Sequence, residues 1–325
     1  MSYTHLSKED RIMLAALLRE GLSLRACARN IGTSPVTISN EVRANGGRDY
    51  YTPGLAHRRR LRSRLAANQC HRKLGRDKEL TDKVIELLSE DWSPEQIAGR
   101  MVLEWGFKLS SPTSIYNYIN SRKELHNLLP RKCNKYRRTK AGNLRKALRE
   151  GLPNKKSIDT RPEIVKKRTE LGHWEGDTIV GKERTARILT HVERKSGYLL
   201  AELLQVVSAE IVSETSVRSF RGLSRSKKVT ITYDNGTEFS DHEVTEKQTR
   251  MDIYFAHAYH SWERGTNENT NGLIRRYFPK GTYFRTINSN QLKTVVTKIN
   301  HRPRKRLGYK TPYEVFNGVT VRTLI

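Results

Sequence analysis

Short apolar stripes at helical spacing dominate the first fifty residues, and each begins behind a residue that can cap a helix. The segment Ser7-Lys8-Glu9-Asp10 has the form of a capping box. An apolar stripe follows it, and Gly21 is expected to end that helix. The stripe consists of Ile12, Leu14, Ala15, Leu17 and Leu18. A second short helix is predicted from Ser23 to about Asn30.

A tight turn, Gly32-Thr33-Ser34-Pro35, separates the second helix from a third. Ser34 suits the N-cap and Pro35 suits the first helical position. Ala28 lies four residues before Gly32, so the two helices can approach closely. This predicts a helix-turn-helix whose last helix would enter a DNA major groove, with a plain three-helix bundle as the alternative. The positions presented to DNA would be Thr33, Ser34, Thr37, Ser39, Asn40 and Arg43.

A related pattern returns between residues 91 and 123. Ser93-Pro94-Glu95-Gln96 is another capping box, and the segment 111–115 repeats the Ser-Pro pattern of residues 34–38. Residues 104–110 lengthen the spacing between the two helices. A second helix-turn-helix is therefore predicted, with a helical hairpin that only packs as the alternative. Its DNA-facing residues would be Thr113, Ser114, Tyr116 and Asn117.

From about residue 162 the pattern becomes strand-like. Three strands are followed by a helix, an alternating strand, a charged helix, a short strand and a last helix. The order β-β-β-α-β-α-β-α favours an α/β domain built on a mixed sheet. The strands are expected at 173–180, 186–193, 198–204, 229–234 and 253–256, and the helices at 208–220 and from near 265.

Five segments follow from these patterns. The predicted bounds are 1–48 for the first helix-turn-helix, 49–90 for a basic helical linker, 91–123 for the second helix-turn-helix, 124–161 for another basic linker and 162–325 for the α/β domain with its helical tail.

The charge balance points to a polyanionic partner. Lys and Arg number 61 against 34 acids, a net charge of +27. Nucleic acid is the first candidate and an anionic membrane the second. Residues 50–76 and 131–149 contain no acid, so we expect them to clamp DNA phosphates. The arginines singled out there are Arg58, Arg59, Arg60, Arg137 and Arg138.

The chain has no apolar run long enough for a spanning helix and no signal-peptide pattern at its start. We therefore expect a cytoplasmic, nucleoid-associated protein. Its three cysteines are far apart, which favours reduced thiols over disulfides or zinc ligands.

Three carboxylates carry the candidate chemistry: Asp177 in GDTIVG, Asp234 in YDNGTEF and Glu268 in RGTNENTNGLIRR. Such a cluster suits a pair of divalent cations, since Mg²⁺ prefers oxygen ligands. Scattered surface acids are the alternative. On a helical wheel Arg275 falls on the face of Glu268, where it could hold a DNA phosphate. His257 and His260 form an i, i+3 pair, but no third close ligand is evident, so core or surface histidines are the favoured interpretation.

These motifs, together with YFPKG and the tail NHRPRKRLGYKTPYEVF, resemble the IS-thirty family of bacterial insertion-sequence transposases, part of the retroviral-integrase-like superfamily. The resemblance spans nearly the whole chain. It implies a ribonuclease-H-like catalytic domain and a catalytic, metal-holding triad of Asp177, Asp234 and Glu268.

Several expectations about activity follow from the resemblance. Two Mg²⁺ ions, with Mn²⁺ as a substitute, would support cleavage and strand transfer of double-stranded DNA at terminal inverted repeats. A homodimer or larger assembly on DNA is expected, because two ends must be joined. A non-enzymatic DNA-binding regulator and a nuclease that cuts without joining remain the alternatives.

Overall fold

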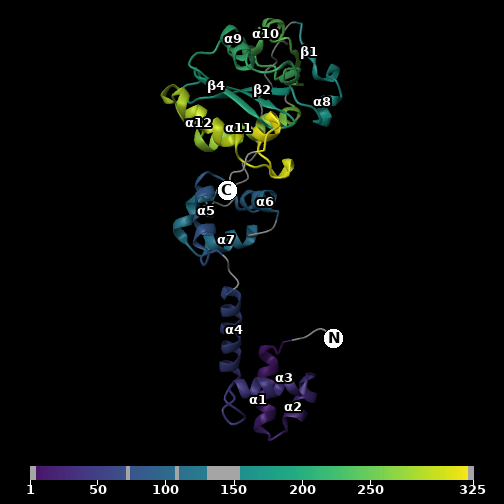
Figure 1. The fold of residues 1–325 in the computed structure, drawn as a ribbon, viewed down its shortest axis with the longest axis vertical. Coiled ribbons are helices and arrows are strands. Elements are labelled where there is room, and N and C mark those ends of the chain that lie inside the picture. Colours follow the sequence, from purple (N-terminus) through teal and green to yellow (C-terminus); the bar gives the residue numbers. More distant parts are fainter. Residues whose placement is uncertain (1–4, 71–73, 107–109, 130–153, 259, 321–325) are drawn as a thin grey trace. The chain divides into compact units, whose positions relative to one another are not determined.

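The computed structural model describes residues 5–70, 74–106, 110–129, 154–258 and 260–320 (Figure 1). They belong to two compact units, Met1–Asp77 and Lys78–Ile325. Within these described ranges, no helix combines the length and the apolar character needed to cross a membrane.

The first unit consists of four helices: α1 (Lys8–Arg19), α2 (Leu24–Ile31), α3 (Pro35–Ala44) and α4 (Pro53–Cys70). The predicted capping box of α1 is confirmed. The predicted stripe is partly wrong, because Ile12 is 53% exposed and Arg11 is buried in its place. Arg11 lies on the face of Leu14 and Leu18, and its guanidinium is neutralised by Glu41 at 2.6 Å.

The turn between α2 and α3 has the predicted chemistry. Gly32 ends α2 in the left-handed conformation with φ of 74°, which glycine adopts without a steric cost. The Ser34 hydroxyl accepts a hydrogen bond from the Thr37 amide, and Pro35 is the first residue of α3. α2 and α3 therefore form two short helices joined by a tight turn.

The second unit begins with α5 (Lys78–Ser89), α6 (Pro94–Trp105) and α7 (Pro112–Asn120). The capping box predicted at Ser93 is present, and Ser111 caps α7 through the Ser114 amide. Both helices start with Pro, as the repeated Ser-Pro pattern indicated.

The rest of this unit is built on a six-stranded sheet in the order β1-β6-β5-β2-β3-β4. The pairs β2–β3 and β3–β4 are antiparallel, whereas β5 pairs with β2 in parallel and β6 pairs with β5 in parallel. The predicted mixed α/β order is confirmed and has the ribonuclease-H-like arrangement. β1 was not predicted, since it has only two residues. The strands are β1 (Lys156–Ser157), β2 (His173–Val180), β3 (Arg187–Glu193), β4 (Leu199–Leu204), β5 (Thr230–Tyr233) and β6 (Asp252–Phe255).

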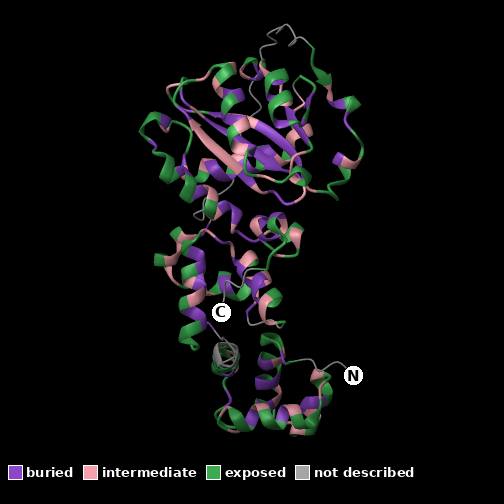
Figure 2. Ribbon diagram, turned by 45° about the horizontal axis from the view of Figure 1, so that its top comes forward, coloured by how far each residue is buried: buried purple, intermediate pink, exposed green. Residues whose placement is uncertain are grey.

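Helices cover both faces of this sheet, with α9 and α10 over one and α11 and α12 over the other (Figure 1). Each face has its own apolar core, and the central strands are almost wholly buried (Figure 2). Side chains alternate along β2, so Trp174 packs with α9 and Ile179 packs with α11. Asp177 shares the parity of Ile179 and thus faces α11. The helices are α8 (Ile164–Lys167), α9 (Ala209–Phe220), α10 (His242–Thr249), α11 (Gly265–Tyr277), α12 (Ser289–Asn300) and α13 (Pro312–Asn317).

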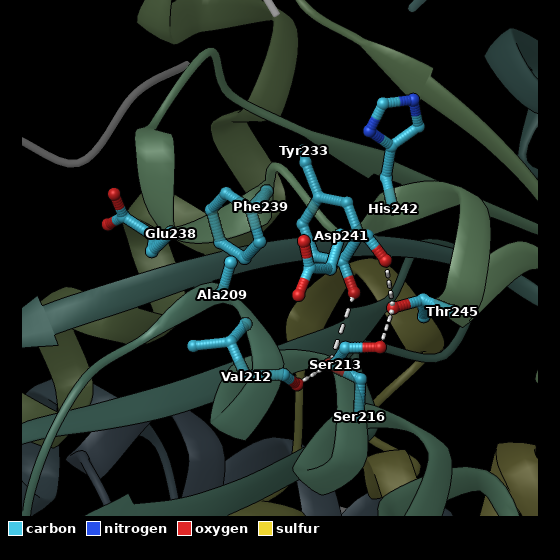
Figure 3. A pocket seen from close by; sticks show the side chains of 10 residues that line it. All are labelled: Ala209, Val212, Ser213, Ser216, Tyr233, Glu238, Phe239, Asp241, His242 and Thr245. Carbon is cyan, nitrogen blue, oxygen red and sulfur yellow. Dashed lines mark hydrogen bonds between the residues drawn. The ribbon is translucent and has the colours of Figure 1, made fainter.

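Polar side chains line a small pocket between α9 and α10 (Figure 3). Thr245 donates to the Ser213 hydroxyl at 2.8 Å, and the buried Tyr233 hydroxyl donates to Ser216 at 3.4 Å. Several of the hydroxyl groups that line this pocket are thus bonded to one another.

A buried ion pair ties α6 to the end of the chain. The Arg100 guanidinium donates to both carboxylate oxygens of Glu314, at 2.7 and 2.8 Å, and also to Glu104 at 2.6 Å. Beside it, the Tyr309 ring packs so close to Gly99 that a Cβ there would lie 2.3 Å from the ring. Only glycine at position 99 permits this approach.

His191 gives the sheet a pH-dependent stability. It is buried on β3 with a 3.0 Å hydrogen bond to the Tyr233 hydroxyl, and burial lowers its pKa to about 3. Below the unfolded value near 6.5, the unfolded chain therefore takes up a proton that the folded chain does not. We expect the free energy of unfolding to fall as pH drops from about 6.5 towards 3, by up to about 1.4 kcal/mol per pH unit from this group.

Urea unfolding of wild type and His191→Gln across this pH range measures that contribution. The variant should be less stable at pH 7 but should show a shallower decline in acid. His301→Gln, at a half-buried histidine on the surface, is the control and should keep the wild-type slope. Equal slopes in wild type and His191→Gln would contradict the expectation.

Candidate active site

The sheet brings the two predicted aspartates together. Asp177 lies within β2, and Asp234 directly follows β5, the strand that pairs with β2 in parallel. The preceding Gly176 is required by packing, because a Cβ there would lie 2.2 Å from the Tyr233 ring. In the GDT motif, Gly176 thus allows the close contact with Tyr233 of β5, and Asp177 places a carboxylate on the face of the sheet that α11 covers.

One guanidinium bridges these two carboxylates. Arg264 lies 3.5 Å from the Asp177 Oδ2 atom and 3.2 Å from the Asp234 Oδ2 atom, with only 12% of its side chain exposed. A single cation thus reaches both aspartates. Sequence reasoning did not single out Arg264, although it stands first in the quoted RGTNEN motif. Its role depends on the chain path between β6 and α11, which no local pattern specifies.

Further donors fix the direction of each carboxylate. Asn271 donates to Asp177 Oδ2 at 2.9 Å, and the Thr178 amide donates to Oδ1 at 2.8 Å. Asp234 accepts from the Gly236 amide at 3.1 Å. Both side chains are held in place while an oxygen of each is directed to the same cation.

The surroundings of Asp177 change the pKa of its carboxyl group. Burial raises its pKa to about 6, and the neighbouring Asp234 charge adds to the rise, while Arg264 opposes it. The site therefore favours a cation close to these two carboxylates.

Glu175 and Asn267 anchor α11 to the sheet. Glu175 is fully buried, pairs with Arg194 at 2.7 Å and accepts from the Asn267 amide at 2.9 Å. The Asn267 side chain in turn donates to the Glu175 carbonyl and accepts from Thr190. This explains why poor helix formers occupy the start of α11. These contacts of Glu175 join the sheet to α11.

Glu268 lies on the same face of α11 as two residues that contact β2. Asn271, three residues later, bonds Asp177, and Arg275, seven residues later, donates to the Val180 carbonyl at 2.7 Å. Glu268 is exposed, and no hydrogen bond or ion pair within the described ranges joins it to either aspartate.

Arg275 was predicted to face outward with Glu268 towards DNA. In the structure it is half-buried, bonded to the end of β2, and its guanidinium lies 5.5 Å from the Phe284 ring centre. These contacts help to dock α11 on the sheet.

Glu238 is a further acid near Asp234, since a Cβ added at Gly236 would lie within 3.0 Å of both carboxylates. It is paired with Arg187 and accepts from the Thr178 hydroxyl at 2.9 Å. Arg187 thus neutralises the charge of Glu238.

The donor set suits a hard divalent cation. Asp177 and Asp234 present carboxylate oxygens from rigid elements, and both already converge on one positive group, Arg264. Mg²⁺ takes oxygen ligands of this type, and Glu268 can add a third carboxylate from α11. The residues therefore fit the metal that the resemblance implies.

The predicted DNA-facing residues are on helix surfaces. On α3 and the turn before it, Ser34, Ser39, Asn40 and Arg43 are exposed, while Thr33 and Thr37 are half-buried. Thr113, Ser114, Tyr116 and Asn117 are exposed on α7, and Arg58, Arg59 and Arg60 are exposed on α4. Arg137 and Arg138 lie outside the described residues.

Comparison with known proteins places these features in a family. Residues 2–45 match the family model described as a helix-turn-helix domain. The catalytic core domain of BIV integrase aligns with a TM-score of 0.36 at 18% identity, over 45% of this chain and 93% of that chain.

Two transposases resemble this protein over almost its full length. The chain is 37% identical to the transposase for insertion sequence element IS4351 of Bacteroides fragilis, over 97% of this chain and 96% of that protein. It is 35% identical to transposase InsI for insertion sequence element IS30A of Escherichia coli (strain K12), over 96% of this chain and 83% of that protein. The chain therefore belongs to the IS30 (IS-thirty) family of insertion-sequence transposases.

Proposed function

We propose that this transposase binds the terminal inverted repeats of its insertion sequence and carries out metal-dependent cleavage and strand transfer of DNA. Asp177, Asp234 and Glu268 would hold two Mg²⁺ ions, with Mn²⁺ as a substitute. The observation that carries the proposal is the convergence of Asp177 and Asp234, from separate strands, on one guanidinium.

Residues of the chain prepare the site for phosphoryl transfer. Asn271 and the Thr178 amide orient Asp177, and the Gly236 amide orients Asp234. Glu175 and Asn267 hold α11, and with it Glu268, against β2. Bound Mg²⁺ would supply Lewis-acid stabilisation of phosphate oxygens and a lowered pKa for the attacking hydroxyl. No covalent bond between protein and DNA is required.

Arg264 would act as the resident counter-ion of the aspartates. In its observed position it offsets part of the repulsion between the two carboxylates, which lie on the same partly enclosed surface. When metal is held there, the guanidinium becomes available to a DNA phosphate, which it can bind through two parallel hydrogen bonds.

The helix-turn-helix units and basic segments would supply DNA affinity. With a net charge of +27, the chain suits a polyanion, and each neutralised phosphate contributes roughly −0.9 to the slope of log K against log salt. α3 and α7 expose short polar side chains of the type that contact base edges. Joining two element ends also requires at least a dimer on DNA.

The proposal is tested with the purified full chain and duplexes that carry the DNA flanking its reading frame. With Mg²⁺ or Mn²⁺, we expect nicks at the repeat ends and strand-joined products, and neither product after chelation. Nicks without joined strands would show a nuclease. Sequence-specific binding without nicks in either metal would show a regulator and would overturn the proposed activity. A scrambled-end duplex is the control for specificity.

A further inference from the structure

Two histidines and one carboxylate meet in the segment between β6 and α11, and none of them is one of the two aspartates described above. The ligand atoms of His257, His260 and Glu263 all lie within 4.8 Å of one another. From the sequence, the histidine pair was expected to lack a third close ligand. That expectation is wrong, because Glu263 lies close to both rings.

Two of the distances between these atoms are close to the edge length of a small coordination polyhedron. Glu263 Oε1 lies 2.9 Å from His257 Nδ1 and 3.3 Å from His260 Nδ1. Zinc held at bond lengths of about 2.0–2.1 Å in a tetrahedron separates its ligand atoms by about 3.3 Å. Only small side-chain movements would therefore bring all three donors around one ion.

The contacts of the two ring nitrogens of His257 resemble those of a metal-binding histidine. His257 places Nε2 2.9 Å from an Asp159 oxygen, which leaves Nδ1 directed to the cluster. Histidines that bind metals commonly donate their second ring N–H to a carboxylate, and this fixes the tautomer. Glu263 accepts from the His257 backbone amide through Oε2, so its Oε1 is the atom shared by both rings.

The donor chemistry separates this cluster from the aspartate site. Two imidazoles and one carboxylate suit zinc and similar transition metals, whereas Mg²⁺ prefers oxygen ligands alone. Without a metal the same groups would form a half-exposed set of hydrogen bonds, which contributes little to stability. A measurement of metal binding therefore distinguishes a zinc site from a set of surface hydrogen bonds.

We propose that His257, His260 and Glu263 form a site for Zn²⁺, with Asp159 as the outer partner of His257. A water would complete a tetrahedral shell. The ion would tie the segment that leads into α11 to the 3-10 turn Ile158–Thr160. Since Arg264 directly follows Glu263, a bound ion would also fix the backbone from which Arg264 reaches the two aspartates. The role is structural, and its ligands are distinct from those of the proposed Mg²⁺ site.

The test uses chelator-treated full-length protein titrated with Co²⁺, whose visible absorption reports tetrahedral N/O coordination, followed by displacement with Zn²⁺. We expect one equivalent to bind and the band to disappear when Zn²⁺ is added. His260→Gln and Glu263→Gln should weaken binding by more than about 100-fold, and Asp159→Asn by about 10–100-fold. Zinc should raise the melting temperature of wild type but not of His260→Gln.

Two control variants make the result specific. His301→Gln, a half-buried histidine stacked on Tyr313 outside the cluster, should keep the wild-type spectrum. The double variant Asp177→Asn, Asp234→Asn should also keep it, which separates this site from the proposed catalytic one. The proposal is overturned if wild type binds no Co²⁺ or Zn²⁺ below 100 µM, or if either control abolishes the spectrum. Equal metal-free melting temperatures of wild type and His260→Gln would exclude misfolding as the cause of a lost signal.

Discussion

Asp177→Asn is expected to abolish nicking and strand transfer while leaving binding to the element ends within twofold of wild type. The substitution removes one negative charge from the cation-binding pair but preserves the shape of the side chain. Its amide oxygen can still accept the hydrogen bond from Asn271, so the fold should persist. Loss of a metal-holding carboxylate should reduce the cleavage rate by about 1,000-fold or more, which corresponds to about 4 kcal/mol in the barrier.

The measurement is single-turnover cleavage of an end duplex in Mg²⁺, paired with a gel-shift titration of the same duplex. Glu268→Gln should behave in the same way. Asp252→Asn is the matched control, since this exposed aspartate of β6 forms an ion pair with Lys156 of β1, away from the two aspartates. It should retain at least half of the wild-type rate. Cleavage at the wild-type rate by Asp177→Asn or Glu268→Gln would remove the basis of the proposed active site.

Arg100→Met should be the most destabilising substitution in the second unit. It would leave the buried carboxylate of Glu314 without its guanidinium partner, and Glu104 would lose the same charge. Breaking a buried ion pair from one side costs about 3–5 kcal/mol. That is a large share of the roughly 5–15 kcal/mol that stabilises a typical domain.

Urea unfolding followed by circular dichroism measures the loss, and hydrogen exchange should localise it to α6 and α13. Lys305→Met is the matched control, because the Lys305–Glu95 pair also joins the tail to α6 but is exposed on both sides. It should change the free energy of unfolding very little, because solvent screens an exposed ion pair. The double variant Arg100→Met, Glu314→Gln should recover part of the stability lost in Arg100→Met. A loss in Arg100→Met no greater than in Lys305→Met would show that the buried pair contributes little.

Local signals in the sequence predicted most of the elements. The capping residues Ser7, Ser34, Ser93, Ser111 and Ser208 all accept the expected amide hydrogen bonds, because capping involves neighbours three residues away. The strands of the sheet were also predicted from their sequence patterns. By contrast, Arg11 was missed as a buried residue because its partner Glu41 lies thirty residues away.

The candidate site was predictable only in part. Its acids stand in recognisable motifs, so the sequence alone was enough to name Asp177, Asp234 and Glu268. Arg264 and Glu263 could not be assigned roles, since both depend on the irregular path between β6 and α11. Polar residues such as Asn267 and Asn271 were identified as costly for a helix, and their bonds to β2 and β3 supply the reason.

The pairing of Arg100 with Glu314 has a consequence during synthesis. The two residues are 214 positions apart, so at roughly 5–20 residues per second the ribosome needs about 10–40 s to deliver the partner that α6 requires. Throughout that interval the nascent chain contains Arg100, which is buried in the folded protein, but Glu314 has not yet been synthesised. A polypeptide released early by a truncated message would keep this defect permanently, which would expose it to degradation before it could compete with complete molecules.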